Sequence, residues 1–284
     1  MALLNSLPRW DGPLKASLRA ERSIPSMDLC ESNKKVAKEV RDFIQNVPDV
    51  KEESISDYLV WKWAEIDKRF KFINIRTFTR KEEYELTGAD FELEIWLIGN
   101  RFRYPLLIQA KKLVKPFDSY VSKLNYPNGT QDQIKKLINY SRLKKRLPFY
   151  LFYSLPDKDT RTMCPRNDFL DCGVFLADAF TVKKFADRTW GSRVSKNKIL
   201  LRSNPFYCIV CCPLAYQGEY FESYFGNVAE LLEVVSNQDM PEYISVIMSG
   251  QWKEMGEDDL LSLVRRNELT QYRAVGVYDM RYGE

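Results

Sequence analysis

The stretch TGADFELEIWLIGNRFRYPLLIQAKKL, residues 87–113, constrains the fold more than any other part of the chain. In its first half apolar residues alternate with acids, which is typical of a β-strand with two unlike faces. Its second half is almost continuously apolar until a glutamine and a lysine, as expected of a strand covered on both faces. Gly99-Asn100 lies between the halves and predicts a two-residue hairpin turn. We therefore expect a sheet that contains this hairpin.

The predicted turn determines which side chains of the hairpin lie together. It places Asp90 directly opposite Gln109, with Lys111 diagonally adjacent on the same face. Glu92 and Glu94 follow Asp90 on that face, because strand side chains alternate. Packing alone would favour Val, Ile or Thr at such positions. The convergence of polar side chains therefore predicts a functional site.

Periodicity predicts further elements on both sides of the hairpin. Residues 28–46 have apolar side chains at helical spacing, and a second helix follows residues 53–56. Residues 70–78 alternate like a strand, residues 130–146 form a helix with a basic face, and residues 147–154 form a buried strand. Strand, helix and strand in this order predict a right-handed crossover. The predicted fold class is α/β (mixed α+β), with a central mixed sheet flanked by helices.

Three regions are expected along the 284-residue chain. An N-terminal arm and helix occupy residues 1–50, a core occupies 51–155, and a C-terminal α/β extension, 156–284, packs on the core. The first residues, MALLNSLPRWDGP, lack the basic and apolar regions of a signal peptide, and no run of about 18 apolar residues occurs. We therefore expect a cytoplasmic protein with no membrane segment.

The chain contains no histidine. This excludes Ser-His-Asp and Cys-His triads and His-ligated zinc hydrolases. Catalysis would have to use carboxylates, lysine, tyrosine, cysteine or a metal held by oxygen ligands. The net charge of +4 is only mildly basic, so nucleic-acid binding would depend on local clusters of charge.

The six cysteines are expected to stay reduced in the cytosol, so no disulfide is predicted. Cys208 and Cys211 have the spacing of zinc ligands. They lie in the apolar string FYCIVCCPL, where buried thiols are the favoured interpretation. Tyr150, Phe152 and Tyr153 are likewise expected in the core and not as a platform for stacked bases.

The predicted cluster offers the oxygen ligands that Mg²⁺ or Mn²⁺ prefers. Asp90 would bind the ion, with the side-chain oxygen of Gln109 and the carbonyl of Ala110 as further ligands. Lys111 would orient water or stabilise the charge that develops on a phosphate. Because Gln109 is neutral, the site should bind its metal more weakly unless Glu92 or an acid on the second helix compensates for the missing negative charge. Together these residues support hydrolysis of phosphodiester bonds.

The motifs GAD and IQAKK resemble those of the PD-(D/E)XK nuclease superfamily. They look closest to the Mrr-type restriction branch, in which glutamine replaces the second acid. The resemblance covers roughly residues 52–154 and implies a restriction-endonuclease-like core, with an early acid on a helix and a flanking basic helix. It also implies a magnesium-dependent nuclease, with DNA a better candidate than RNA, and a role in restriction or anti-phage defence. A homodimer is left open.

Under this resemblance Asp90 matches the motif aspartate, Gln109 the variable acid and Lys111 the motif lysine. Glu53 and Asp57, on one face of the second helix, both fit the early acid, and the choice between them stays open. The basic helix and the lysine after the motif are expected to contact phosphates, through Lys112, Gln133, Lys135, Lys136, Arg142 and Lys144.

Two other function classes are left open. Nucleotidyltransferases also place paired acids on a strand, as in ADFELE, but RKEEYEL lacks the Gly-Ser helix start that such enzymes need upstream. The neutral Gln109 also fits a catalytically degenerate member that acts as a nucleic-acid-binding or scaffold module. A metal-dependent nicking assay separates this module from the enzyme.

Overall fold

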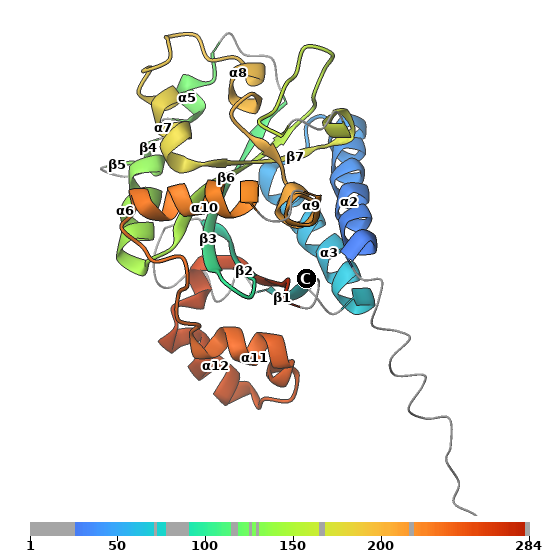
Figure 1. Cartoon of the computed structure of the whole chain (residues 1–284), viewed down its shortest axis with the longest axis vertical. Helices are drawn as coiled ribbons and strands as arrows, with labels where there is room; N and C mark the ends of the chain where they lie inside the picture. The colour runs from blue at the N-terminus through green and yellow to red at the C-terminus, as the bar shows by residue number, and fades with distance from the viewer. Residues whose placement is uncertain are drawn as a thin grey trace, which may run out of the picture.

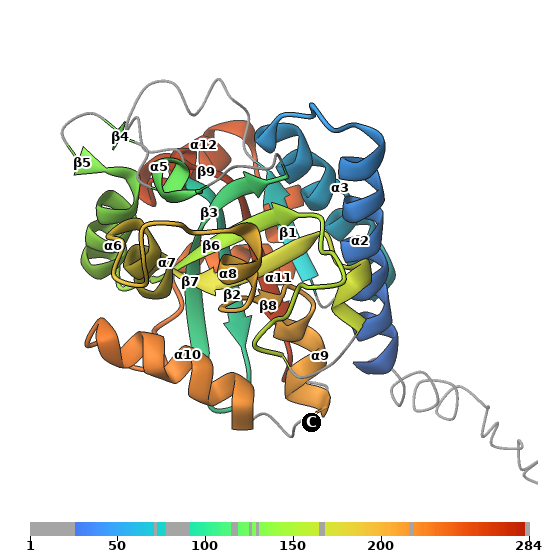
Figure 2. The ribbon, with the colours of Figure 1, turned by 90° about the horizontal axis from the view of Figure 1, so that it is seen from above.

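Helices cover both faces of a seven-stranded mixed β-sheet (Figure 1, Figure 2). The computed structural model of the chain describes residues 26–70, 73–77, 91–114, 119–124, 127–128, 131–164, 168–215 and 219–281. The predicted α/β class, with a central mixed sheet flanked by helices, is confirmed.

The sheet contains both parallel and antiparallel strand pairs. In spatial order its strands are β1 (Ile73–Thr77), β9 (Tyr272–Asp279), β2 (Phe91–Ile98), β3 (Arg103–Leu113), β6 (Leu147–Ser154), β7 (Val174–Asp178) and β8 (Asn204–Pro205). The pairs β2–β9 and β3–β6 are parallel, and the others are antiparallel. A separate two-stranded ribbon consists of β4 (Pro127–Asn128) and β5 (Gln131–Asp132).

The helices divide between the two faces of the sheet. One face packs mainly against α6 (Gln133–Lys144), α7 (Ala179–Ala186), α8 (Lys196–Leu200), α11 (Glu242–Ser249) and α12 (Glu257–Arg266). The other packs mainly against α2 (Ser26–Asn46), α3 (Glu52–Phe70), α9 (Cys208–Ala215) and α10 (Glu219–Leu231). The short α5 (Val121–Leu124) lies next to α7 (Figure 1). The first of these two layers is called the α6 face below, and the second the α3 face.

Local periodicity identified the main elements of residues 26–154, since the predicted helices correspond to α2, α3 and α6 and the predicted strands to β1, β2, β3 and β6. The short α5, β4 and β5 were not predicted. Tyr150 and Phe152 are buried on the α6 face and Tyr153 on the α3 face, as expected of core residues. The region 156–284 does more than pack on a core, because it supplies β7, β8 and β9 to the same sheet. Indeed, β9 separates β1 from β2.

The hairpin turn lies one residue beyond its predicted position. The backbone N–H of Gly99 donates to the carbonyl of Phe102 at 2.9 Å, so Asn100 and Arg101 form the turn. A Cβ atom on Gly99 would lie 2.5 Å from the Phe102 ring. The glycine is therefore required by this close approach, and it misled the prediction of the turn.

The strand register differs accordingly from the predicted one. Leu93 pairs with Ile108, so strand position 92, and not 90, follows opposite Gln109. The predicted pairing of Asp90 with Gln109 does not fit this register, and Asp90 itself lies outside the described residues. A shift by two residues leaves each side chain on its predicted face of the sheet.

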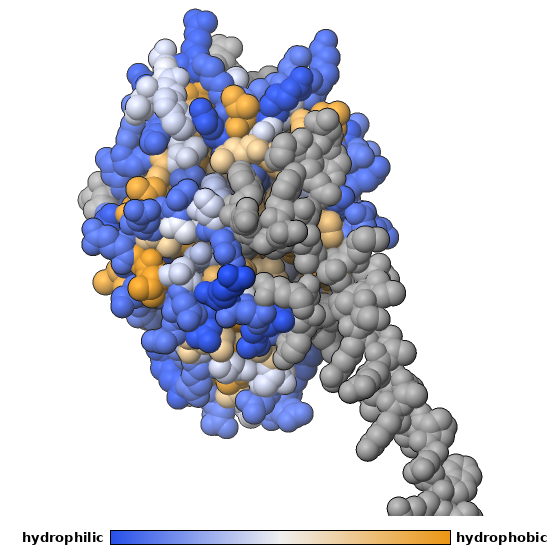
Figure 3. Space-filling model, viewed as in Figure 1, coloured by the Kyte–Doolittle hydropathy of each residue, from blue (hydrophilic) through white to orange (hydrophobic). Residues whose placement is uncertain are grey.

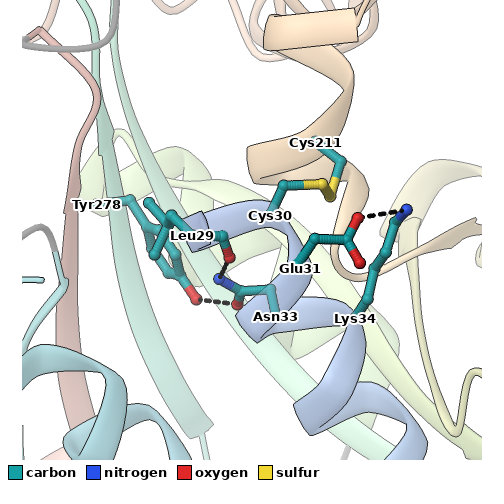
Figure 4. The surroundings of a disulfide bond; sticks show 7 residues. All are labelled: Leu29, Cys30, Glu31, Asn33, Lys34, Cys211 and Tyr278. Carbon is teal, nitrogen blue, oxygen red and sulfur yellow. Dashed lines mark hydrogen bonds and ion pairs between the residues drawn. A yellow bond between two sulfur atoms is a disulfide. The ribbon is translucent and has the colours of Figure 1, made fainter. Parts of the chain in front are cut away.

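A disulfide joins Cys30 of α2 to Cys211 of α9, so the prediction that no disulfide forms is wrong (Figure 4). The two cysteines are 181 residues apart in sequence, and only the packing of the two helices brings them together. Next to this bond, Asn33 donates to the Leu29 carbonyl at 2.9 Å and accepts from the Tyr278 hydroxyl at 3.1 Å. These contacts attach the start of α2 to β9, the strand next to the edge strand β1.

For metal sites and membrane segments, the structure informs on the described residues only. There, no group of three or more His, Cys, Asp and Glu side chains is placed to hold a metal ion. Cys208 is a buried free thiol, as expected, whereas Cys211 is engaged in the disulfide. No helix in the described part of the chain is long and apolar enough to cross a membrane.

Candidate functional site

The candidate site lies at the carboxyl end of β3, where two polar side chains share the α6 face of the sheet. Gln109 pairs with Tyr150 of β6, and Lys111 pairs with Phe152. Gln109 is 3% exposed, whereas Lys111 is half-buried. The side-chain amide nitrogen of Gln109 donates to the Ala110 carbonyl at 3.5 Å. A buried amide therefore lies two residues before a more accessible lysine, as the sequence predicts.

The acid that the structure places at this strand end is Glu52, the first residue of α3. Its Oε2 accepts a hydrogen bond from the backbone N–H of Lys112 at 2.6 Å. The Lys112 ammonium donates to the carbonyls of Pro48 and Val50 at 2.6 and 2.7 Å. Lys112, predicted to contact phosphate, thus attaches the loop before α3 to β3.

Neither predicted early acid takes the place of Glu52. Glu53 is exposed, and Asp57 pairs with Arg273 of β9 at 2.7 Å. The sequence carried a signal that Glu52 lies on the inward side of α3. Ser56, four residues after Glu52, is buried and hydrogen-bonds the Tyr153 hydroxyl at 2.8 Å, so both lie on the inward side of α3.

Tyr150 contributes a buried hydroxyl next to Gln109. From the sequence, Tyr150 was expected only as a core residue. This hydroxyl has no hydrogen-bond partner among the described residues. Burial raises the pKa of Tyr150, and the negative charge of Glu52 raises it further. The hydroxyl therefore stays protonated, and it is a hydrogen-bond donor whose acceptor is not among the described residues.

The basic helix α6 starts at the same end of the sheet, since it runs antiparallel to the β3–β6 pair that it connects. The side-chain oxygen of Gln133, at its first position, is buried without a partner among the described residues. Of the predicted phosphate contacts on α6, Lys135 pairs with Asp132 at 3.1 Å, and Lys144 pairs with Glu268 at 2.7 Å. Arg142 is exposed, and Lys136 is half-buried.

Glu94, the last acid on the predicted polar face of the strand, is buried in a cluster of hydrogen bonds. Its side chain is fully buried, and its Oε1 accepts hydrogen bonds from Trp96 Nε1 at 2.6 Å, Arg146 Nε at 3.0 Å and the Tyr243 hydroxyl at 2.6 Å. Burial is the largest single influence on the pKa of Arg146 and lowers it, but Glu94, Tyr243 and Tyr272 together raise it by more, so the guanidinium stays charged. Arg146 thus belongs to a buried ion pair and not to the basic face of α6.

Comparison with known proteins places the chain in a family. The model of a family of unknown function, DUF6615, matches residues 29–275. The chain belongs to this family. No curated protein and no solved structure matches it. The DUF6615 match spans α2 to β9 and so includes every element that contributes to the candidate site.

The described donors at this DUF6615 site are chemically suited to a hard divalent ion. They comprise the Glu52 carboxylate, the Gln109 amide and the Ala110 carbonyl, all oxygen ligands of the kind that Mg²⁺ accepts. The other predicted ligands are Asp90, which lies outside the described residues, and Glu92, whose backbone is part of β2 but whose side chain lies outside them.

Proposed function

We propose that this DUF6615 protein is a metal-dependent nuclease that hydrolyses phosphodiester bonds, with DNA as the favoured substrate. The GAD and IQAKK motifs support the proposal through their resemblance to PD-(D/E)XK nucleases. The fold supports it because a helix with an acid, a central mixed sheet and a flanking basic helix are all present. A role in restriction or anti-phage defence is part of the same proposal and rests on the resemblance alone.

The residues of the site would divide the work as follows. Glu52, the Gln109 oxygen and the Ala110 carbonyl would hold Mg²⁺ or Mn²⁺ together with Asp90 and Glu92. The ion would polarise the phosphate and lower the pKa of a bound water.

One further side chain would act on the substrate directly. Lys111 would stabilise the negative charge that develops on the phosphate oxygens. Tyr150 is fully buried beside Gln109, so it would support the site from within the sheet layer and would not contact the substrate.

One observation carries the proposal: the Glu52 carboxylate is bonded to the backbone of the strand end that presents Gln109 and Lys111. Glu52→Gln tests it, because the amide oxygen can still accept from the Lys112 N–H while the charge is lost. We expect Mg²⁺-dependent nicking of supercoiled plasmid to fall by at least ~100-fold.

Glu53→Gln is the matched control, since it removes one charge from the neighbouring, exposed position of the same helical turn. It should leave nicking within about two-fold of the wild type, because surface substitutions of this kind have small effects. Equal losses in both variants, or no loss in Glu52→Gln, would count against the proposed site.

A second function is favoured by a specific feature of the described residues, which include no group of three or more carboxylates able to hold a metal. On this account the protein is a degenerate nuclease-fold module that binds nucleic acid without cleaving it. Purified protein that binds plasmid equally well in EDTA and in Mg²⁺, and never nicks it, would favour the module over the enzyme.

A further inference from the structure

Residues 183–202, from α7 through α8, contain seven lysines and arginines but a single acid, Asp187. Two of the seven cations have acidic partners within the molecule. Lys183 pairs with Asp187, and Lys196 pairs with Asp157 at 2.9 Å. The others are exposed and have no acid at ion-pair distance among the described residues: Lys184, Arg188, Arg193, Lys198 and Arg202.

An exposed indole organises this cluster. Trp190 is 38% exposed, and its ring packs against Phe185 with the ring centroids 4.8 Å apart. Lys184 Nζ and Arg202 Cζ each lie 5.3 Å from the centroid of the indole. Such cation–π contacts hold the two charges beside the ring without neutralising them. The surface formed by Lys184, Arg188, Trp190, Arg193 and Arg202 is called the Trp190 surface below.

The backbone of the Trp190 surface is well tied to the rest of the fold. The N–H groups of Arg188 and Thr189 donate to the carbonyls of Phe185 and Lys184 at 3.0 and 2.9 Å, which closes the end of α7. Gly191 continues the turn with a φ of +106°, a conformation that favours glycine. The cations are therefore displayed on an ordered loop.

The same loop is bonded to the segment that follows β3. The Tyr120 N–H donates to the Val194 carbonyl at 2.9 Å, and the Ser119 hydroxyl donates to the Ser192 carbonyl at 3.2 Å. Because β3 ends a few residues earlier, the loop and Lys111 lie at the same edge of the sheet. Figure 3 shows hydrophilic residues along the top of the molecule, where Figure 1 places α5, α7 and α8.

We propose that the Trp190 surface binds the sugar–phosphate backbone of a nucleic acid whose scissile bond lies at the candidate site. The choice of nucleic acid as the partner rests on the proposed nuclease function. A row of unneutralised cations matches a row of phosphates, and an exposed aromatic ring among them is typical of surfaces that hold single strands. α6 is expected to make fewer phosphate contacts than its sequence predicts, because two of its lysines pair with acids.

Fluorescence anisotropy with a labelled single-stranded oligodeoxynucleotide in EDTA tests this surface without requiring cleavage. Arg188→Ala/Arg193→Ala should weaken binding by about ten-fold and reduce the slope of log K against log salt by about 1.4, which is two contacts at ~0.7 each. Trp190→Ala should weaken binding by roughly five-fold or more, through the lost stacking and the released cations.

Lys35→Ala/Arg265→Ala is the charge-matched control, since it removes two exposed cations from α2 and α12. It should change the affinity by less than about two-fold and leave the salt slope nearly unchanged. If the control weakens binding as much as Arg188→Ala/Arg193→Ala does, the Trp190 surface is not the binding site.

Arg188→Gly separates a binding role from a structural one. Arg188 has a φ of +60°, so glycine should relieve backbone strain and raise Tm by about 2 °C, while the loss of the cation weakens binding. A raised Tm together with weaker binding supports the proposal. A raised Tm with unchanged binding overturns it. A wild type that binds through this surface but never cleaves would refute only the nuclease function, whereas cleavage and binding that survive every variant would refute only the surface.

Discussion

Replacing Arg146 with leucine should destabilise the protein more than any other single change of a charged residue considered above. The Glu94 carboxylate is fully buried and the Arg146 side chain is 15% exposed, with 3.0 Å between Nε and Oε1. At that separation and an effective dielectric constant of ~20 the Coulomb attraction is about 5 kcal/mol. Arg146→Leu removes this attraction and leaves a buried charge with only two neutral donors, Trp96 and Tyr243.

The expected loss in the free energy of unfolding is about 3–5 kcal/mol, the range found when one partner of a buried ion pair is removed. Urea denaturation followed by circular dichroism measures it. The double variant Glu94→Gln/Arg146→Leu should recover at least ~2 kcal/mol of the loss, because no buried charge remains.

Lys144→Ala provides the control, since Lys144 forms a largely solvent-exposed pair with Glu268 close to Arg146. Its cost should stay below about 1 kcal/mol. A cost below about 1 kcal/mol for Arg146→Leu, or a double variant no more stable than the single one, would refute the assignment of Glu94 to a structural ion pair.

Three further outcomes are expected. Lys111→Ala should abolish Mg²⁺-dependent cleavage of plasmid with little change in Tm by differential scanning fluorimetry, and cleavage at the wild-type rate would contradict its role. Reduction of the Cys30–Cys211 bond should lower the free energy of unfolding by about 2–5 kcal/mol because it releases a long loop, and an unchanged urea midpoint in dithiothreitol would contradict this. Burial alone would raise the pKa of Asp157, but hydrogen bonds from α8 lower it, so its stabilising contribution is present above the ordinary aspartate pKa of about 4 and is lost as pH falls below it. Asp157→Asn should therefore cost more stability at pH 7 than at pH 2, and an equal cost at both values would contradict the ion-pair explanation.

Local patterns in the sequence were sufficient for the longer helices and strands of residues 26–154, but not for the short α5, β4 and β5 or for the arrangement of the whole sheet. Alternation and helical spacing are properties of neighbouring residues, which a short window contains. The position of β9 between β1 and β2 depends on pairing between segments far apart in sequence, as in Ile73 with Tyr278, which are 205 residues apart. No local pattern encodes such a pairing, so the C-terminal region was expected to be an extension.

The candidate site was predictable to the extent that it depends on strand alternation. Gln109 and Lys111 share a face as expected, because the period of two does not depend on the turn. Glu94 was expected in the functional cluster with Asp90 and Glu92, and its ion pair was not predicted, because its partners Arg146 and Tyr243 are 52 and 149 residues away in sequence. Glu52, the acid that the structure places at this strand end, lies one residue before Glu53. Glu53 and Asp57 were selected because residues four apart share one helical face.

The neutral residue at position 109 is explained by the charge that its sheet face already contains. Glu94 pairs with Leu107, so Gln109 is its diagonal neighbour, and diagonal Cβ atoms lie about 7 Å apart. At an effective dielectric constant of ~20, two carboxylates at that distance repel by about 2 kcal/mol. Arg146 already balances Glu94, and Gln109 is 3% exposed. In EDTA we therefore expect Gln109→Glu to be less stable than the wild type by about 2 kcal/mol, and Mn²⁺ to restore most of this loss by binding the new carboxylate. Gln109→Leu, the control, should lose stability to a similar or smaller extent but gain none from Mn²⁺. If Mn²⁺ stabilises Gln109→Glu no more than it stabilises the leucine variant, no metal binds beside residue 109. The proposed metal-dependent mechanism would then be refuted.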